Sequence, residues 1–298
     1  MSTLPASVTI VEVGPRDGLQ NESALISTAD KIAFIDRLTA SGLREIEVSA
    51  FVSPRWVPQL ADAGDVFNGI TRRPHVRYSA LVPNLAGLER ALAADVTEVA
   101  IFAAATETFS RKNTNRGIDE SFGTYKEVTD AAIAAGLRVR GYLSTAFGCP
   151  FEGPVSVDTV VGLTSRLLDL GVYEVAVSDT IGTAHPGQVQ RVLAHLLVPL
   201  PSTRIALHFH DTRGMALANV LTALDFGIAT FDSSAGGLGG CPYAPGSSGN
   251  LATEDLVYML DGLAIDTGVK IDRVSDAARG IAPLLTHGLS SRYTQARQ

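Results

Sequence analysis

Cysteine is scarce in this sequence, with only Cys149 and Cys241 among 298 residues. Two cysteines do not make a disulfide framework, and they lack the spacing of a structural zinc site. A reducing compartment is the expectation for such a chain. Residues 1–7 have neither a basic region nor an apolar core of signal-peptide length, and no uncharged apolar run approaches 18 residues. We therefore predict a cytoplasmic protein that does not interact with membranes.

A surplus of positive charge is also missing. The chain has 24 lysines and arginines against 31 acidic residues, a formal net charge of -7. Without a broad basic surface, binding to nucleic acid is not expected. Apolar residues are plentiful, at 46% of the chain, and charged residues make up 18%. This composition indicates a globular protein with a substantial core.

Short apolar runs alternate with helical patterns along most of the chain. Four helical patterns stop at a glycine, namely Gly42, Gly136, Gly171 and Gly227, and an apolar run follows at once. Glycine suits the left-handed residue just past a helix, and short apolar runs suit parallel strands buried on both faces. The strand candidates are residues 8–13, 43–51, 75–81, 96–102, 137–140, 172–177, 205–208 and 228–231.

Eight strands alternating with helices predict an α/β protein with a TIM (β/α)8 barrel. We expect residues 1–298 to form one domain, with a barrel core at about 8–262 and a helical extension at about 263–298. An open doubly wound sheet is the alternative. No Gly-x-Gly-x-x-Gly follows the first strand, however, so a dinucleotide site has no support.

The polar residues suited to chemistry fall at the carboxyl ends of the predicted strands, where barrel enzymes have their active sites. His208 and His210 end the seventh strand and point to one face, because side chains alternate along a strand. Asp17 follows the first strand and is a natural oxygen ligand to complete a metal site. Structural histidines and a turn aspartate are the plainer interpretation of the same residues.

Other polar residues fall on the same rim. The guanidinium of Arg16 is suited to stabilise negative charge that develops on a substrate oxygen. The plainer interpretation is an ion pair between Arg16 and Glu47, and the two roles are compatible. Asp179 ends the sixth strand. A polar loop at residues 110–116, with Arg111, Lys112 and Asn113, either grips phosphates or is only a solvated surface.

Residues 233–250 are the least ordinary segment, because this loop contains six glycines. It links a buried strand to a helix beginning near Thr253. Such a loop brings backbone N–H groups close to a ligand and is able to close over a site. Cys241 within it is a candidate proton donor or nucleophile, or else a passive small side chain. Asn250 offers a carbonyl oxygen to a metal, or else belongs to the next helix's amino-terminal cap region.

Five motifs taken together resemble the 3-hydroxy-3-methylglutaryl-CoA lyase family, and the likeness runs from about Val8 to about Leu260. They are GPRDGLQNE at 14–22, FVSPRWVPQ at 51–59, SDTIG at 178–182, HFHD at 208–211 and GGLGGCPY at 236–243. The resemblance implies cleavage of 3-hydroxy-3-methylglutaryl-CoA, an acyl-CoA substrate, to acetyl-CoA and acetoacetate in leucine degradation. It also implies a divalent cation, Mg²⁺ or Mn²⁺, and a homodimer.

The resemblance assigns roles to individual residues. Asp17, His208, His210 and Asn250 match the metal ligands, Arg16 the residue that stabilises enolate charge, and Cys241 the thiol that transfers a proton. Glu47 and Asp179 match supporting polar residues, and either Asp17 or His208 serves as the base. We add as substrate-binding candidates Arg16, Gln20, Arg111, Lys112 and Asn113.

Several alternative functions are compatible with parts of this pattern. A lyase for a longer 3-hydroxy-acylglutaryl-CoA or an acyl-CoA condensing enzyme would share the motifs. A metal-dependent hydrolase on a TIM barrel is expected to show further His or Lys ligands on the middle strands. Two histidines and a carboxylate also describe an iron oxygenase, which uses antiparallel strands instead. A non-catalytic acyl-CoA binding protein would leave Asp17 and Cys241 without a purpose.

Overall fold

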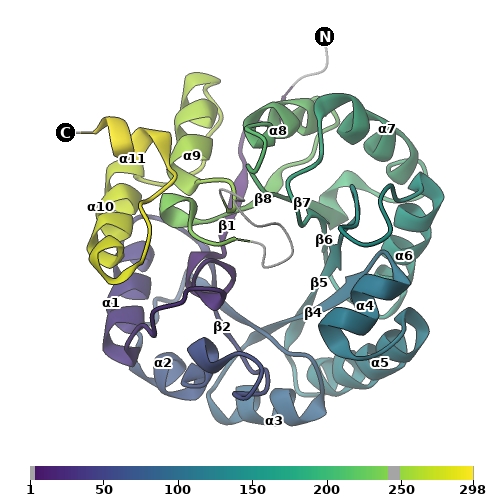
Figure 1. The fold of residues 1–298 in the computed structure, drawn as a ribbon, viewed down its shortest axis with the longest axis horizontal. Helices are drawn as coiled ribbons and strands as arrows, with labels where there is room; N and C mark the ends of the chain where they lie inside the picture. The colour runs from purple at the N-terminus through teal and green to yellow at the C-terminus, as the bar shows by residue number, and fades with distance from the viewer. Residues whose placement is uncertain (1–3, 241–248, 298) are drawn as a thin grey trace.

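A closed barrel of parallel strands lies at the centre of the molecule (Figure 1). The computed structural model describes residues 4–240 and 249–297. Each strand pairs with the next in chain order, and β8 closes on β1 with Thr9 opposite Thr230. The strands are β1 (Thr9–Glu12), β2 (Glu45–Ala50), β3 (Arg77–Leu81), β4 (Glu98–Ala104), β5 (Arg138–Ser144), β6 (Val175–Asp179), β7 (Ile205–Phe209) and β8 (Thr230–Ser233). The predicted TIM barrel is confirmed.

Helices surround the barrel as an outer ring (Figure 1). They are α1 (Thr28–Thr39), α2 (Ala63–Gly69), α3 (Leu85–Ala93), α4 (Glu107–Thr114), α5 (Ile118–Ala134), α6 (Val157–Asp169), α7 (Pro186–Leu196), α8 (Ala216–Leu224), α9 (Thr253–Gly262), α10 (Ile271–Ile281) and α11 (Arg292–Ala296). In the described part of the chain, none of them has the length and apolar character that crossing a membrane requires. Helix α10 packs against α1 and α9, and so completes the ring.

The glycines at the predicted helix ends have the backbone that was expected. Gly42, Gly136, Gly171 and Gly227 have φ angles of +99°, +81°, +100° and +74°. At Gly42 space matters as well, because a Cβ there would lie 2.3 Å from the carbonyl oxygen of Gly268. Glycine therefore permits both the turn and the close approach of the segment that leads into α10.

The barrel interior contains mostly small and polar side chains. Ala100, Ala176 and Ala206 face inward, while their strand neighbours pack outward against the helices. The fully buried side chain of Arg140 occupies the space that these alanines leave, together with Tyr142. The apolar core therefore lies between strands and helices, and the interior is a polar network below the active-site rim.

The segment after β1 forms a single π-helical turn, Gly14–Gly18. One local expectation from the sequence is wrong. The polar loop expected at residues 110–116 is mostly helix α4, which ends where Asn115 adopts a left-handed backbone with φ +58°. The few apolar residues of α4 give no clear period, yet Glu107 pairs with Arg111 at 3.6 Å one turn along the helix.

Candidate active site

The π-helical turn Gly14–Gly18 places Arg16 and Asp17 at the mouth of the barrel. The Val13 carbonyl accepts hydrogen bonds from the amides of Asp17 at 2.8 Å and Gly18 at 3.1 Å. A Cβ on Gly18 would lie 2.9 Å from the Leu238 Cβ, and a Cβ on Gly14 would meet a carboxylate oxygen at 2.6 Å. These small residues let the turn fit tightly against the segment after β8.

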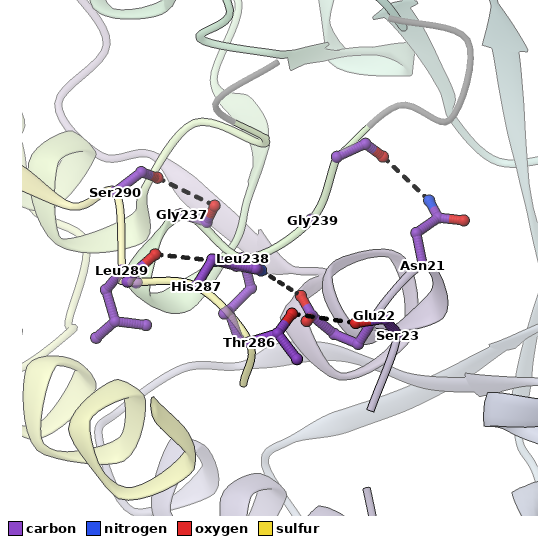
Figure 2. Close-up of a pocket in the computed structure, with 13 residues that line it drawn as sticks. Asn21, Glu22, Ser23, Gly237, Leu238, Gly239, Thr286, His287, Leu289 and Ser290 are labelled. Carbon is purple, nitrogen blue, oxygen red and sulfur yellow. Dashed lines mark hydrogen bonds and ion pairs between the residues drawn. The ribbon is translucent and has the colours of Figure 1, made fainter. Parts of the chain in front are cut away.

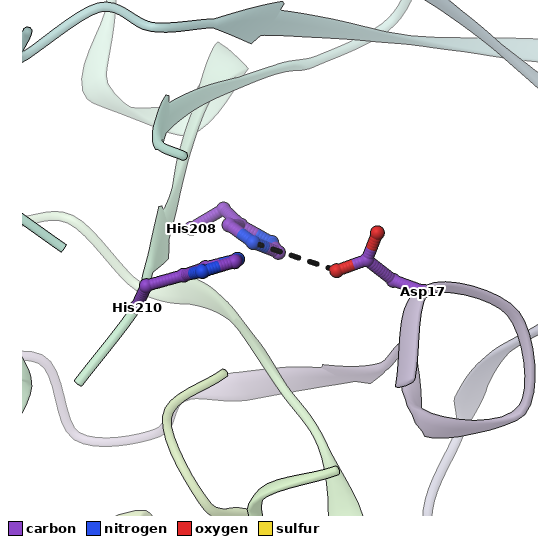
Figure 3. Close-up of side chains that lie close together, drawn as sticks. All are labelled: Asp17, His208 and His210. Atoms are coloured by element: carbon purple, nitrogen blue, oxygen red, sulfur yellow. Dashed lines mark ion pairs between the residues drawn. The ribbon is translucent and has the colours of Figure 1, made fainter. Parts of the chain in front are cut away.

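Asp17, His208 and His210 come together as the sequence predicted (Figure 3). Each offers one ligand atom, and the three atoms lie within 4.8 Å of one another. The Nε2 atom of His208 is 3.9 Å from Oδ2 of Asp17. The two imidazoles lie side by side, with ring centroids 5.2 Å apart, because they stand two residues apart at the end of β7.

Two buried polar atoms beside this triad have no hydrogen-bond partner among the described residues: Nδ1 of His210 and Oδ1 of Asn250. Asn250 pairs with His210 in a short antiparallel bridge. Its Nδ2 donates to Oδ2 of Asp17 and to the carbonyl of Leu238, both at 3.0 Å. Burying a polar atom without a hydrogen-bond partner costs free energy, so these two atoms are suited to coordinate a cation. The donor set of nitrogen and oxygen suits a divalent metal.

The surroundings of Asp17 and His210 favour the protonation states that bind metals. Burial raises the pKa of Asp17, but Arg16 and the two histidines outweigh it and lower this pKa to about 2. Burial and then the neighbouring His208 lower the pKa of His210 to about 4. At neutral pH Asp17 is therefore an anion and His210 a neutral imidazole, as metal coordination requires.

Arg16 is held by two carboxylates. Its Nε donates to Oε2 of Glu47 at 2.6 Å, and its Nη1 to Oδ1 of Asp17 at 2.7 Å. Its guanidinium also lies 5.5 Å from the centroid of the Tyr142 ring. The ion pair with Glu47 anticipated from the sequence is present, and it fixes the guanidinium beside Asp17. Arg16 is consequently both buried and preorganised.

Sequence reasoning missed Asp232 and Arg140, which lie directly behind the triad. Asp232 contacts Nδ1 of His208 at 3.2 Å, and Arg140 donates to the other Asp232 oxygen at 2.8 Å. Burial disfavours the charged form of His208, but Asp232 and then Asp17 raise its pKa. The signal available was a charged residue inside an apolar strand, in Phe231-Asp232 and in Val139-Arg140.

A cavity of about 680 Å³ opens over the triad, and it contains most of the predicted substrate-binding residues. Gln20, Lys112 and Asn113 line it together with Arg16. Arg111 is not among its described lining residues, and its side chain is 68% exposed beside Glu107. The cavity is large enough for a small acyl group, and its lining includes the cations Lys112 of α4 and Arg116 just beyond it.

Asp179, another predicted catalytic residue, lies near enough to the triad to interact electrostatically with His208, but its described hydrogen bonds go elsewhere. Both oxygens of Asp179 accept backbone amides, from Thr183 and Ala184 at 2.9 Å each, so this carboxylate secures the turn after β6. Burial raises the pKa of Asp179 despite these amides. Cys241 lies outside the described residues.

The glycine-rich segment 236–240, which leads toward Cys241, runs between two other parts of the chain (Figure 2). On one side, Asn21 donates to the Gly240 carbonyl at 3.0 Å. On the other, Ser290 donates to the Gly237 carbonyl at 3.1 Å. The ion pair of His287 with Glu22, at 2.9 Å, links these two sides. The carboxy-terminal extension thus supports the glycine-rich segment next to the barrel mouth.

The fold and the site define a TIM-barrel enzyme with a candidate metal-binding triad at its catalytic rim. A family model described as HMGL-like matches residues 7–281. The hydroxymethylglutaryl-CoA lyase YngG of Bacillus subtilis is 53% identical over 291 residues, which cover 98% of this chain and 97% of that protein.

Solved structures agree. The hydroxymethylglutaryl-CoA lyase of Pseudomonas aeruginosa has a TM-score of 0.96 at 49% identity, covering 98% of both chains. An HMG-CoA lyase of Acinetobacter baumannii, solved with coenzyme A and 3-methylmalate, has a TM-score of 0.94 at 38% identity and covers 100% of this chain and 97% of that one. The chain belongs to the hydroxymethylglutaryl-CoA lyase family of carbon–carbon lyases, as its motifs suggested.

Proposed function

We propose that this chain cleaves 3-hydroxy-3-methylglutaryl-CoA to acetyl-CoA and acetoacetate. The observation that carries the proposal is the Asp17, His208 and His210 triad beside Arg16 at the floor of a cavity at the barrel mouth. The near-full-length similarity to proteins named hydroxymethylglutaryl-CoA lyase supports the same reaction. The Acinetobacter baumannii relative, solved with coenzyme A, supports an acyl-CoA substrate.

The reaction needs one proton removed and one returned. A base takes the proton of the tertiary hydroxyl, and the C–O bond becomes the ketone of acetoacetate. The electron pair of the C2–C3 bond moves to the departing fragment, the thioester enolate. A proton delivered to that carbon completes acetyl-CoA. Asp17 and His208 both flank the cavity floor, and one of them serves as the base.

Four residues would hold a divalent cation, either Mg²⁺ or Mn²⁺: Asp17, His208, His210 and Asn250. When bound, the ion would polarise the substrate's oxygens and make the hydroxyl proton more acidic. Arg16 would stabilise the negative charge on the enolate oxygen, because Glu47 holds its guanidinium in place. Cys241 would return the proton to carbon, and Asp179 would keep the rim in shape through the turn after β6.

We place the acyl-CoA chain along the cavity wall formed by α4 and the segment around the π-helical turn Gly14–Gly18. Lys112, Asn113 and Gln20 line that wall, and Arg111 stands outside it on the exposed face of α4. We also propose that the barrel at about 8–262 and the extension at about 263–298 form one domain. Their contacts at Gly237 and Glu22 support this. The homodimer and the cytoplasmic location stay predictions.

A product assay tests the proposed function. Purified protein supplied with Mn²⁺ is incubated with 3-hydroxy-3-methylglutaryl-CoA and, separately, with a longer 3-hydroxy-acylglutaryl-CoA. We expect acetyl-CoA and acetoacetate in equal amounts from the first substrate, at a higher kcat/KM than with the second. Faster cleavage of the longer substrate would assign the chain to the alternative specificity. Release of free coenzyme A without acetoacetate would indicate a hydrolase.

A further inference from the structure

We propose that Asp232 is a positioning residue that fixes the ring of His208, so that its Nε2 lone pair faces the metal site. The proposal rests on the metal site assigned under the proposed function. It adds a role for a carboxylate that lies behind the triad and outside the cavity that the substrate would occupy.

The geometry ties the Asp232 carboxylate to one particular ring atom. His208 and Asp232 are opposite one another in the parallel pairing of β7 with β8. Nδ1 of His208 lies 3.2 Å from Oδ2 of Asp232, whereas Nε2 points the other way, 3.9 Å from Oδ2 of Asp17. An ionised carboxylate accepts hydrogen bonds only, so Nδ1 must carry the proton. That tautomer leaves Nε2 bare and able to bind a cation.

Arg140 holds the Asp232 carboxylate in place. Its Nη2 donates to Oδ1 of Asp232 at 2.8 Å, while its Nε donates to Glu174 at 2.9 Å and its Nη1 to Tyr142 at 2.9 Å. Arg140 is 2% exposed and Asp232 1% exposed. Each carboxylate oxygen of Asp232 thus has its own partner, and the guanidinium is fixed at three points. The histidine is therefore oriented by a rigid ion pair.

His210, in contrast to His208, has no carboxylate partner at its Nδ1 atom among the described residues. Its Nδ1 is buried without a hydrogen-bond partner among the described residues, so no carboxylate chooses its tautomer. Of the two imidazoles, only His208 has its ring orientation and tautomer fixed by a hydrogen bond to a described carboxylate. Loss of such an outer partner typically weakens metal binding about 10- to 100-fold.

The Asp232→Asn variant tests this role because it would reverse the tautomer. Arg140 needs an acceptor, so the amide oxygen of Asn would turn toward Arg140 and the amide NH₂ toward Nδ1. Nδ1 would then have to accept, which puts the proton on Nε2 and blocks the ligand position. We expect the Kd for Mn²⁺, measured from the free-ion electron paramagnetic resonance signal, to rise about 10- to 100-fold. A Kd within about threefold of that of the unmodified protein would overturn the proposal.

Glu98→Gln is the matched control. Glu98 is 3% exposed at the start of β4, accepts from Tyr173 at 2.7 Å and pairs with Arg138 at 3.3 Å. Glu98→Gln removes the charge of a buried carboxylate and its ion pair with the half-exposed Arg138, at the opposite end of the barrel from the triad. We expect this variant to keep the unmodified affinity for Mn²⁺. An equal loss of affinity in both variants would make Asp232 a general fold residue and overturn the proposal.

A measurement on the unmodified protein needs no variant to fold. Nitrogen-15 NMR of labelled histidine reports the tautomer of His208 in the metal-free protein at alkaline pH, with the signal assigned by His208→Gln. We expect Nδ1–H with a bare Nε2, and an Nε2–H tautomer would overturn the proposal. If the unmodified protein binds no Mn²⁺, the proposed metal site fails, yet the tautomer still decides whether Asp232 positions the ring.

Discussion

The side-chain nitrogen of Asn250 donates to Oδ2 of Asp17 at 3.0 Å, and the backbone of Asn250 pairs with that of His210 in a short antiparallel bridge. The amide oxygen of Asn250 is buried without a partner among the described residues. Asn250 is the last residue of the loop at 233–250, and Asp17 belongs to the π-helical turn after β1. Their contact thus joins two distant parts of the chain around one proposed cation.

Replacing Asn250 removes the neutral oxygen ligand. Asn250→Ala should raise the Kd for Mn²⁺ by about 10-fold or more while leaving Asp17 and both histidines in place. Isothermal titration calorimetry measures this change. Asn250→Asp is the informative companion, because a second anion beside Asp17 should bind the cation at least as tightly as Asn does. An unchanged Kd in the Ala variant would remove Asn250 from the ligand set.

Arg16 has a chemical role and a structural role that can be separated. Arg16→Gln should lower kcat by roughly 10²- to 10³-fold, because the charge facing the enolate is lost. It should also destabilise the fold by about 3 kcal/mol or more, since Glu47 is left buried and unpaired. Urea denaturation and steady-state kinetics measure the two effects.

The double variant Arg16→Gln/Glu47→Gln is the control for this pair. Removing both charges should restore much of the free energy of unfolding but none of the activity. Recovery of kcat in the double variant would contradict a charge-stabilising role for Arg16, and the loss in the single variant would then reflect the stranded Glu47 alone.

Cys241 is expected to supply the final proton. Cys241→Ala should lower kcat about 100-fold with little change in the affinity for Mn²⁺, because the thiol is not a proposed ligand. Cys149→Ala is the matched control, since the Cys149 thiol is buried and accepts from the Thr106 hydroxyl at 3.0 Å. Unchanged turnover in Cys241→Ala would withdraw the proton-transfer role and leave the lyase assignment intact.

The buried acid Glu12 should make the fold less stable as pH rises. Burial raises the pKa of Glu12 from 4.5 to about 7, despite hydrogen bonds from Thr253, Ala235 and Gly14. A carboxyl whose folded pKa is raised contributes its stability fully below about pH 4.5 and loses it as pH rises through about 7. Glu12 alone should account for about 3 kcal/mol of decline over that range.

Glu12→Gln tests this pH effect. The neutral amide keeps an oxygen for the amides of Gly14 and Ala235 and turns its NH₂ toward Thr253. Urea denaturation at mildly acidic and mildly alkaline pH should show a shallower fall in unfolding free energy than in the unmodified protein. An identical fall in both proteins would mean that Glu12 keeps an ordinary pKa.

The barrel and its catalytic rim could be predicted from sequence because both follow from local patterns. Glycines such as Gly42 and Gly171 mark where helices end and strands begin, and parallel strands bring their carboxyl ends to one rim. Asp17, His208 and His210 therefore met where expected. Helix α4 was missed because its sequence is polar, so no apolar period distinguished it from a loop.

The partners of the site residues could not be predicted in the same way. Arg140 and Asp232 stand 92 residues apart, and nothing local indicates that their side chains meet inside the barrel. A charge within an apolar strand signals only that some partner exists. Register and side-chain direction across β5 and β8 decide which partner it is, and both are properties of the closed barrel.

The most direct test of the central claim is metal-dependent cleavage in a single titration. Protein stripped by a chelator is titrated with Mn²⁺ while acetoacetate release from 3-hydroxy-3-methylglutaryl-CoA and bound Mn²⁺ are followed together. We predict no turnover without metal, activity that rises with occupancy of one site per chain, and loss of both binding and activity in His210→Ala. Full activity in the stripped protein, or Mn²⁺ binding that survives in His210→Ala, would contradict the assignment of this triad as the catalytic metal site.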